Sequence, residues 1–549
     1  MVIGALGLLM PACSLDRYPT TQILLEDAFQ TFEDAERHRN GLYNELRRVR
    51  HGVFTTTTEL MSDLFNASVG FGNRGGQPHR LAEGFRESTE VRDIWVNLFG
   101  AIAQVNFFLD NIENIEPANA EETARIILFT LEAHYARAFL YTVLAQHFMY
   151  PINPNNPTMT HVVGGQAHSI DAPQLGLPLL SRFDFHYRPT RATIRETFDF
   201  ILADIAATRR SDTIAHGIFP GDAPVVARLP QSRHNLDPEM GATTPGQITM
   251  QQAGRITSDA VDALEARVRF MMRDEEAVAI AERLISSNRY PLIAAGEGTL
   301  RAMWRDDNSP EDIFILHATR TSFGTASTGA GGGFSEMNMA IFSTRNTSTG
   351  GWNPDFLPTQ SVLDLYEGDD NRLLVFFSAP GNVVEYTFRH HGVRFFHKFP
   401  GNGVITTGQN RRHRPRMHSI AEMYLIVAEV TQAPQRLNQL RAARGAAPIN
   451  YTGEALLNAI RDEWAREKIG EGFRIESLRR WGPDALERNW GFGTGRRVPQ
   501  DPTSVHNYGH ALFTERQITA EEFYLFTLPI PPQDMRANPN MRQTPSWTF

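Results

Sequence analysis

The chain has 549 residues, of which 41% are hydrophobic and 21% are charged. This composition is typical of a globular protein and excludes a disordered or collagen-like chain. The formal net charge is −9, which disfavours a nucleic-acid-binding protein because such proteins normally carry a basic excess. No run of 18 apolar residues occurs, so the sequence contains no ordinary transmembrane helix.

The N-terminal segment resembles a secretory signal that ends at a lipidation site. Residues 1–12 form a short apolar run that closes with Ala12 and is too short to span a bilayer. Cys13 follows directly and is the only cysteine, which excludes internal disulfides and Cys-based zinc sites. Its position resembles a bacterial lipobox, whose thiol receives a diacylglycerol. We therefore expect a signal peptide over 1–12 and a lipid anchor on Cys13; the alternative is a buried N-terminal segment with an incidental cysteine.

Nearly all the cationic charge is arginine. Lysine and arginine together number 53, and the only lysines are Lys398 and Lys468. A guanidinium group suits planar polar ligands. A GC-rich genome that prefers arginine codons is the simpler interpretation, so this bias predicts no function.

Apolar residues at helical spacing recur along most of the chain. Between 121 and 147, for example, Ala124, Ile127, Leu128 and Leu131 fall on one face of a helix. The same spacing predicts helices near 27–49, 91–113 and 192–208, two helices within 257–288 that are joined near Arg273-Asp274, and further helical pairs at 419–444 and 453–481.

Long irregular stretches rich in Gly, Pro, Asn and aromatic residues separate these helices. They cover 62–90, 150–190, 211–256, 296–360, 378–416 and 489–520, and we expect short strands at 385–388 and 393–396. Paired helices bury their apolar faces by stacking on neighbours. The predicted fold is therefore mainly α, with tetratricopeptide-like helical pairs that form a single scaffold, long irregular loops and a few short strands.

No constellation of residues predicts an enzyme, a cofactor or a metal site. The sequence contains no GxxxxGK[ST], HExxH or GxSxG motif. The adjacent pair His390-His391 is a poor metal site, because neighbouring side chains point to different sides of a strand or helix. Asp306-Asp307 and Glu311-Asp312 could supply a glycosidase carboxylate pair. Beside Pro310 in a polar loop, however, we interpret them as solvated turn residues.

Five charged residues near the C-terminus repeat at intervals of one to four residues: Glu463, Arg466, Glu467, Glu471 and Arg474. On a helix and its exit they can form a ladder of ion pairs. The functional alternative is a site with catalytic carboxylates. We favour the structural charge network.

The order of motifs along the chain resembles the SusD/RagB family of bacterial outer-membrane lipoproteins. The resemblance is carried by an AEMYLIVAE helix at 421–429, an LNQLRAARG turn at 437–445, the EGFR segment at 471–474 and a closing LPIP at 528–531. Weaker similarities follow in order through the N-terminal half. The resemblance implies one SusD-like domain over 13–549, with an N-terminal part at about 13–220 and a C-terminal part at about 255–549.

For function, the resemblance implies binding rather than catalysis. Family members are anchored in the outer membrane through the lipidated cysteine alone, face the cell surface and cap a TonB-dependent SusC-like transporter. They hand it a nutrient, which we expect here to be an oligosaccharide. The alternatives are a RagB-like peptide-binding lipoprotein, a periplasmic helical-repeat adaptor and, least favoured, a hydrolase.

Candidate ligand residues lie in the loops between helices. Sugar recognition needs aromatic faces for the apolar side of the ring and polar side chains for its hydroxyl groups. Three loop segments offer both, and we expect the ligand to lie against these loops rather than in a deep core pocket. For each aromatic residue the alternative is a packing anchor. The predicted ligand residues are Asn66, Phe71, Asn73, Arg74, Trp304, Trp352 and Asn353.

Overall fold

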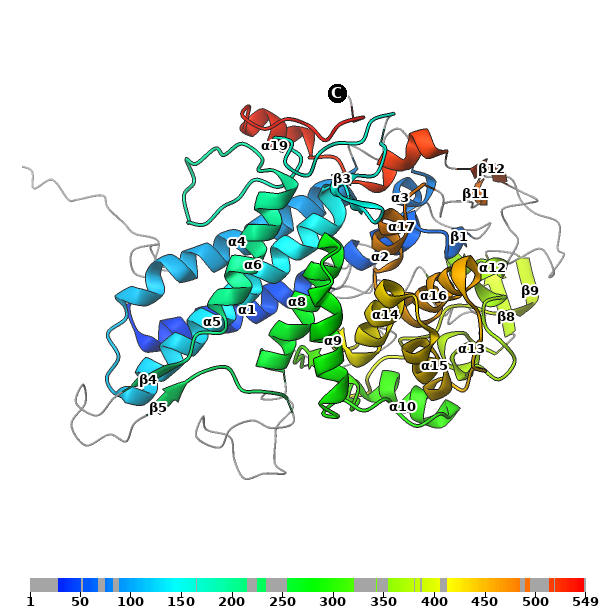
Figure 1. The fold of residues 1–549 in the computed structure, drawn as a ribbon, viewed down its shortest axis with the longest axis horizontal. Helices are drawn as coiled ribbons and strands as arrows, with labels where there is room; N and C mark the ends of the chain where they lie inside the picture. The colour runs from blue at the N-terminus through cyan, green and yellow to red at the C-terminus, as the bar shows by residue number, and fades with distance from the viewer. Residues whose placement is uncertain are drawn as a thin grey trace, which may run out of the picture.

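The computed structural model describes most of the chain (Figure 1). The described residues are 28–50, 53–67, 75–81, 88–163, 165–214, 225–233, 254–319, 342, 354–379, 381–385, 388–404, 412–483, 489–493, 513–517 and 519–547. The predicted signal peptide and Cys13 lie outside them. Among the described helices, none combines the length and the apolar character that crossing a membrane requires.

Long helices form the body of the molecule. In chain order they are α1 (Phe32–Arg50), α2 (Val53–Met61), α4 (Thr89–Asn111), α5 (Ala120–Phe148), α6 (Ile194–Ala207), α8 (Ser258–Met272), α9 (Glu276–Ser286), α10 (Glu297–Asp306), α14 (Ile420–Thr431), α15 (Pro434–Ala443), α16 (Gly453–Lys468) and α17 (Arg474–Trp481). Shorter helical segments are α3 (Gly76–Arg80), η3 (Ile112–Asn114), α12 (Gln360–Leu363), α13 (Asn371–Phe376), η7 (Ala520–Phe526) and α19 (Pro532–Ala537).

The prediction of a mainly helical fold is confirmed. Each region with helical spacing forms a helix, and the stretch 257–288 breaks into α8 and α9 where predicted. Arg273 ends α8 in the left-handed conformation, with φ of 64°. Local sequence sets several helix starts: Thr193 and Glu196 form a reciprocal capping box at α6, and Thr257 accepts a hydrogen bond from Ala260 at the start of α8.

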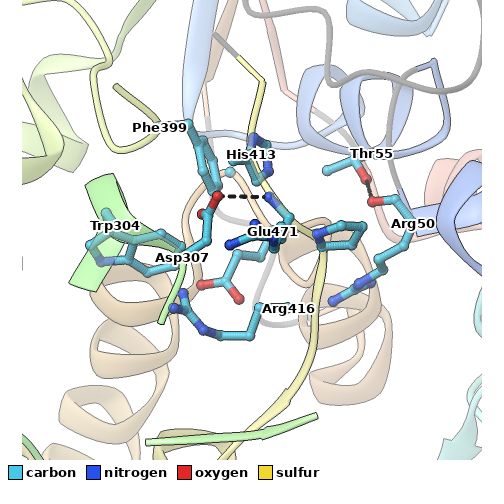
Figure 2. A pocket seen from close by; sticks show the side chains of 11 residues that line it. Arg50, Thr55, Trp304, Asp307, Phe399, His413, Arg416 and Glu471 are labelled. Carbon is cyan, nitrogen blue, oxygen red and sulfur yellow. Dashed lines mark hydrogen bonds between the residues drawn. The ribbon is translucent and has the colours of Figure 1, made fainter. Parts of the chain in front are cut away.

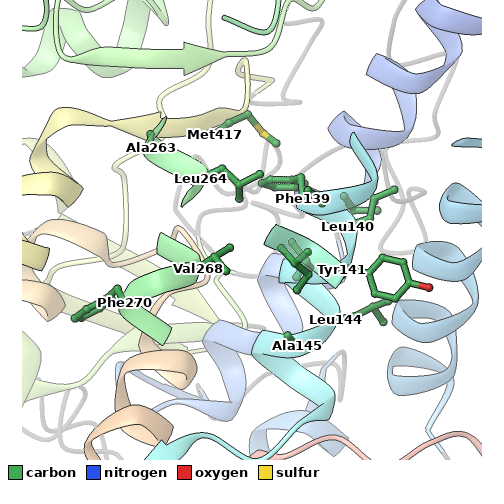
Figure 3. Packing of buried hydrophobic residues seen from close by; sticks show 14 of the residues in the cluster. Phe139, Leu140, Tyr141, Leu144, Ala145, Ala263, Leu264, Val268, Phe270 and Met417 are labelled. Atoms are coloured by element: carbon green, nitrogen blue, oxygen red, sulfur yellow. The ribbon is translucent and has the colours of Figure 1, made fainter. Parts of the chain in front are cut away.

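Helices that are close in sequence pack side by side (Figure 1). The packing runs from α4 and α1 through α5, α6, α8 and α9 to α14, which contacts α15 and α16. Figure 3 shows Phe139 and Leu140 of α5 beside Leu264 of α8, all of them buried. One hydrophobic cluster extends through these helices from Phe29 to Trp547. The stacked pairs therefore share a single apolar interior, as the repeated spacing predicted.

In the described part of the chain, six two-stranded ladders flank this helical body. They pair β1 (Phe65–Ala67) with β7 (Phe356–Pro358), β6 (Asp312–Ile315) with β10 (Arg416–Ser419), β2 (Ile152–Asn153) with β3 (Asn156–Thr160), β4 (Asp212–Ile214) with β5 (Val225–Ala227), β8 (Gly381–Glu385) with β9 (Phe388–Val393) and β11 (Asn489–Gly493) with β12 (Phe513–Gln517), all antiparallel.

The predicted strand positions 385–388 and 393–396 are wrong. Glu385 ends β8 and Phe388 begins β9, so the hairpin turns in the middle of the first predicted strand. Phe396 lies beyond β9 and forms only an isolated bridge with Phe377. The ends of these strands depend on the pairing of β8 with β9, and a run of β-forming residues does not by itself specify that pairing.

Candidate functional site

The β1–β7 ladder pairs described residues that flank two of the predicted ligand loops. Asn66 pairs with Leu357, and Ala67 pairs with Phe356. Because the strands are antiparallel, the chain leaves β1 after Ala67 at the same end of the ladder where it enters β7 at Phe356. The segments that carry Phe71, Asn73 and Arg74 and that carry Trp352 and Asn353 therefore attach to one end of one ladder, although these five residues lie outside the described residues.

A compact cluster of buried aromatic residues packs against β1 of this ladder. Phe65 of β1 is fully buried and lies 4.6 Å from the ring of Phe342 and 5.3 Å from that of Phe396. Phe399 continues the series, with its ring centre 5.9 Å from Phe396. These rings form the centre of a second hydrophobic cluster, separate from the main core. The ladder thus packs on this buried cluster, which we call the aromatic base.

Trp304 belongs to that base, which corrects its interpretation as a loop residue. It lies on α10 rather than in a loop, and only 4% of its surface is exposed. Its ring packs edge-on against Phe399 at 5.3 Å, and the cations of Lys398 and Arg416 lie over its faces at 4.3 and 4.2 Å. A ring this deeply buried has no free face for a sugar, so Trp304 acts as a packing anchor.

Both lysines of the chain converge on one carboxylate. The Nζ atoms of Lys398 and Lys468 lie 2.7 and 3.4 Å from the two carboxylate oxygens of Glu471. Burial by itself would raise the pKa of Glu471, but Lys398, Lys468 and Arg416 lower it to about 2. Gly470, with φ of +80°, makes the sharp turn after α16 that presents Glu471, and a Cβ there would lie 2.4 Å from Phe396.

The predicted charge network near the C-terminus is present and buried, but only Arg466 and Glu463 pair within the predicted set, and Glu467, Glu471 and Arg474 pair with other residues. Glu463 contacts Arg372, Arg441 and Arg466 at 2.7, 3.0 and 2.9 Å. Its side chain is fully buried, and its pKa lies below its usual range because these arginines outweigh the opposing effect of burial. The carboxylates of Glu463, Glu467 and Glu471 are all paired with cations, which favours their charged form. The arrangement therefore suits a structural network and not a catalytic one.

A second part of the network corrects the interpretation of Glu311 and Asp312 as solvated turn residues. Both are fully buried. Glu311 receives two hydrogen bonds from Arg444 at 2.8 and 2.7 Å, and Asp312 pairs with Arg416 across the β6–β10 ladder. Sequence distance hid these partners, because Arg444 lies 133 positions from Glu311.

Two buried carboxylates stand out from the network. Burial raises the pKa of Glu59 to about 7, although the backbone N–H of Gly472 donates to it at 2.6 Å. Burial likewise raises the pKa of Asp307 to about 7, against a hydrogen bond from the backbone N–H of Arg414. Asp307 is therefore buried and not solvated as predicted, whereas Asp306, which is half-exposed and paired with Arg305, fits the prediction.

The described residues contain no group of three or more His, Cys, Asp or Glu side chains that could hold a metal ion. His390 and His391 both lie in β9.

The C-terminal part of the chain matches a known family. Residues 374–547 match the model of the SusD family, and this range contains the 421–429, 437–445 and 528–531 motifs. The comparison with curated proteins gives no match.

Solved structures resemble the chain over nearly its whole length. A SusD superfamily protein from Bacteroides thetaiotaomicron superposes with a TM-score of 0.64 at 19% identity and covers 94% of this chain and 100% of its own. A laminarin-binding SusD-like protein gives 0.63 at 17% identity, covering 94% and 100%. Surface glycan-binding protein A from Bacteroides fluxus gives 0.61 at 17%, covering 94% and 99%. The chain therefore carries the sequence pattern of the SusD family over residues 374–547 and has a SusD-like fold over nearly its whole length.

Proposed function

We propose that this protein is a cell-surface carbohydrate-binding protein that captures an oligosaccharide and passes it to a TonB-dependent SusC-like transporter. The observation that carries the proposal is the SusD-like fold, shared with a laminarin-binding protein and a surface glycan-binding protein.

The proposed ligand site is the end of the β1–β7 ladder, with Asn66 and the adjoining segments that carry Phe71, Asn73, Arg74, Trp352 and Asn353. Loops on a rigid scaffold can vary in specificity without disturbing stacked helices. The buried aromatic base under Phe65 provides such rigidity here. Trp304 is not part of the proposed ligand set because only 4% of its surface is exposed.

An array of glycans and peptides, probed with the purified protein, tests the ligand class. We expect signals from glycans, whereas signals from peptides alone would favour the RagB-like alternative. For the best glycan, Trp352→Ala should weaken binding by roughly 5- to 150-fold, since a stacked ring contributes about 1–3 kcal/mol by analogy with base stacking. Phe185→Ala is the matched control, because Phe185 is 68% exposed and lies outside the proposed site. Equal affinity of both variants would show that the site is misplaced.

We propose that a lipid on Cys13 holds the protein at the outer membrane. Stable anchoring requires more than one acyl chain, so Cys13→Ala should release the protein from membranes without unfolding it. Fractionation of cells that lack the transporter distinguishes attachment through the lipid from attachment through the transporter. Retention of the variant in the outer-membrane fraction of such cells would contradict the lipid anchor, and retention only when the transporter is present would support the partnership.

A further inference from the structure

A small cavity lies where the end of α1, the start of α2, α10 and the two segments 413–416 and 470–471 meet (Figure 2). Arg50 closes one side of it and Trp304 the other. Three arginines, Arg50, Arg414 and Arg416, line it together with two carboxylates, Asp307 and Glu471. None of the residues of the proposed glycan site lines this cavity.

Arg50 is a buried cation with no carboxylate of its own. Only 9% of the residue is exposed, and among the described residues no carboxylate lies within ion-pair distance of its guanidinium group. The ring of Phe473 lies 4.9 Å from its guanidinium carbon. Burial and the nearby charge of Arg267 lower the pKa of Arg50 to about 10, although the more distant carboxylates of Glu471, Glu422 and Glu59 act in the opposite direction, so the group stays charged at neutral pH.

The other charges at the cavity do not neutralise Arg50. Glu471 is shared by Lys398 and Lys468, and Arg416 is paired with Asp312. Arg414 makes one long hydrogen bond, 3.4 Å from its Nε to the carbonyl of Ala318, and within the described part of the chain its guanidinium forms no ion pair. The cavity therefore has an excess of positive charge in a place shielded from water, where an unpaired charge is costly.

The size of the cavity limits what could balance this charge. Its volume is about 30 Å³, which holds two or three water-sized atoms, since one such atom needs roughly 10–15 Å³. A carboxylate group fits this space, and a sugar ring does not. A guanidinium group also matches a carboxylate geometrically, with two parallel N–H donors.

We propose that this cavity binds a carboxylate group, held by the guanidinium groups of Arg50 and Arg414. The group can come from a small free carboxylate such as acetate or from an acidic sugar that inserts only its carboxylate while its ring stays outside the cavity. The site is distinct from the β1–β7 ladder and does not depend on the glycan that the ladder binds.

Thermal unfolding of the whole protein in titrations of sodium acetate tests the proposal, because a ligand that binds only the folded state raises the melting temperature in a saturable way. Acetamide, the neutral isostere of acetate, is the ligand control. Arg50→Gln should weaken the apparent acetate affinity at least tenfold, as expected for a lost charge-assisted hydrogen bond. Arg37→Gln is the matched control, since Arg37 lies on the same helix with a side chain that is 70% exposed. Arg414→Gln serves as a second variant if Arg50→Gln fails to fold.

Titration with glucuronate and with glucose distinguishes the two sources. Glucuronate binding tighter than acetate, with glucose inert, would assign an acidic sugar, and equal affinities would assign the carboxylate alone. Bromide soaked into crystals and located by anomalous scattering provides an independent position for the anion. The proposal is overturned if acetate acts no differently from acetamide, if Arg50→Gln keeps the wild-type affinity, or if the site fills only at molar concentration.

Discussion

Glu467→Gln should destabilise the protein strongly, because Glu467 joins two parts of the buried ion network. Its two oxygens accept hydrogen bonds from Arg444 at 3.0 and 2.7 Å, and one of them also accepts from Arg372 at 3.1 Å. Burial would raise the pKa of Glu467, but Arg444 and Arg372 lower it well below its usual range. The carboxylate is therefore charged at every pH at which the protein is assayed.

The expected loss in the free energy of unfolding follows from the contacts that remain after the substitution. Glutamine keeps the size of the side chain but removes its charge. Its amide N–H₂ group is itself a donor, so it cannot accept a hydrogen bond from the guanidinium groups that it faces. Arg372 is fully buried and keeps Asp370 and Glu463 as partners, while Arg444 keeps Glu311. Removing one partner of a buried pair costs about 3–5 kcal/mol, and we expect a loss of that size in the free energy of unfolding.

Glu297→Gln is the matched control for this measurement. Glu297 forms an i,i+4 pair with Arg301, and both side chains are more than 40% exposed. An exposed pair of this kind contributes about 0.3–0.5 kcal/mol. At this surface position, the same chemical change should therefore lower the free energy of unfolding by roughly a tenth as much.

Urea unfolding at pH 7, followed by far-UV circular dichroism and by tryptophan fluorescence, measures both variants. A lower midpoint with an unchanged slope reports a loss of stability, and coincident curves from the two signals justify a two-state treatment. A Glu467→Gln protein within about 1 kcal/mol of the wild type would refute the idea that this network holds the C-terminal helices together. A change in glycan affinity without a change in stability would favour a functional role for Glu467.

Two further predictions concern Glu59 and Trp304. The pKa of Glu59 rises from 4.5 to about 7 on folding. Between these two pH values the folded protein therefore binds more protons than the unfolded protein. The contribution of Glu59 to stability is present at low pH and is lost as the pH rises through this window. Relative to the wild type, Glu59→Gln should therefore gain on the order of 3 kcal/mol in unfolding free energy between pH 4.5 and 8, and a difference that stays flat in urea unfolding across this range would contradict it. Trp304→Ala should cost about 3–5 kcal/mol and lower the melting temperature while leaving glycan affinity unchanged, with Trp304→Phe as the milder control; a stable variant with weakened binding would return Trp304 to the ligand site.

The sequence by itself determined the helical body. Apolar residues three and four positions apart define a helix face regardless of what covers it, so the helices from α1 to α17 that show this spacing were predictable. The break between α8 and α9 at Arg273 was predictable for the same reason, since the apolar pattern stops there. Short elements such as α10 escaped prediction, because ten residues within a long irregular stretch give too few repeats to establish a period.

Only the tertiary structure decided which charges and rings are buried. Glu463 and Glu467 pointed to a network, but its other members, Arg372, Arg444 and Glu311, come from distant parts of the chain. Trp304 offered the composition of a ligand-binding residue, and its burial between Lys398 and Arg416 depends on segments about 90 to 110 positions away. Local sequence specifies backbone geometry through short-range forces. Burial and ion pairing depend on which distant segments meet, and those contacts exist only once the helices have packed.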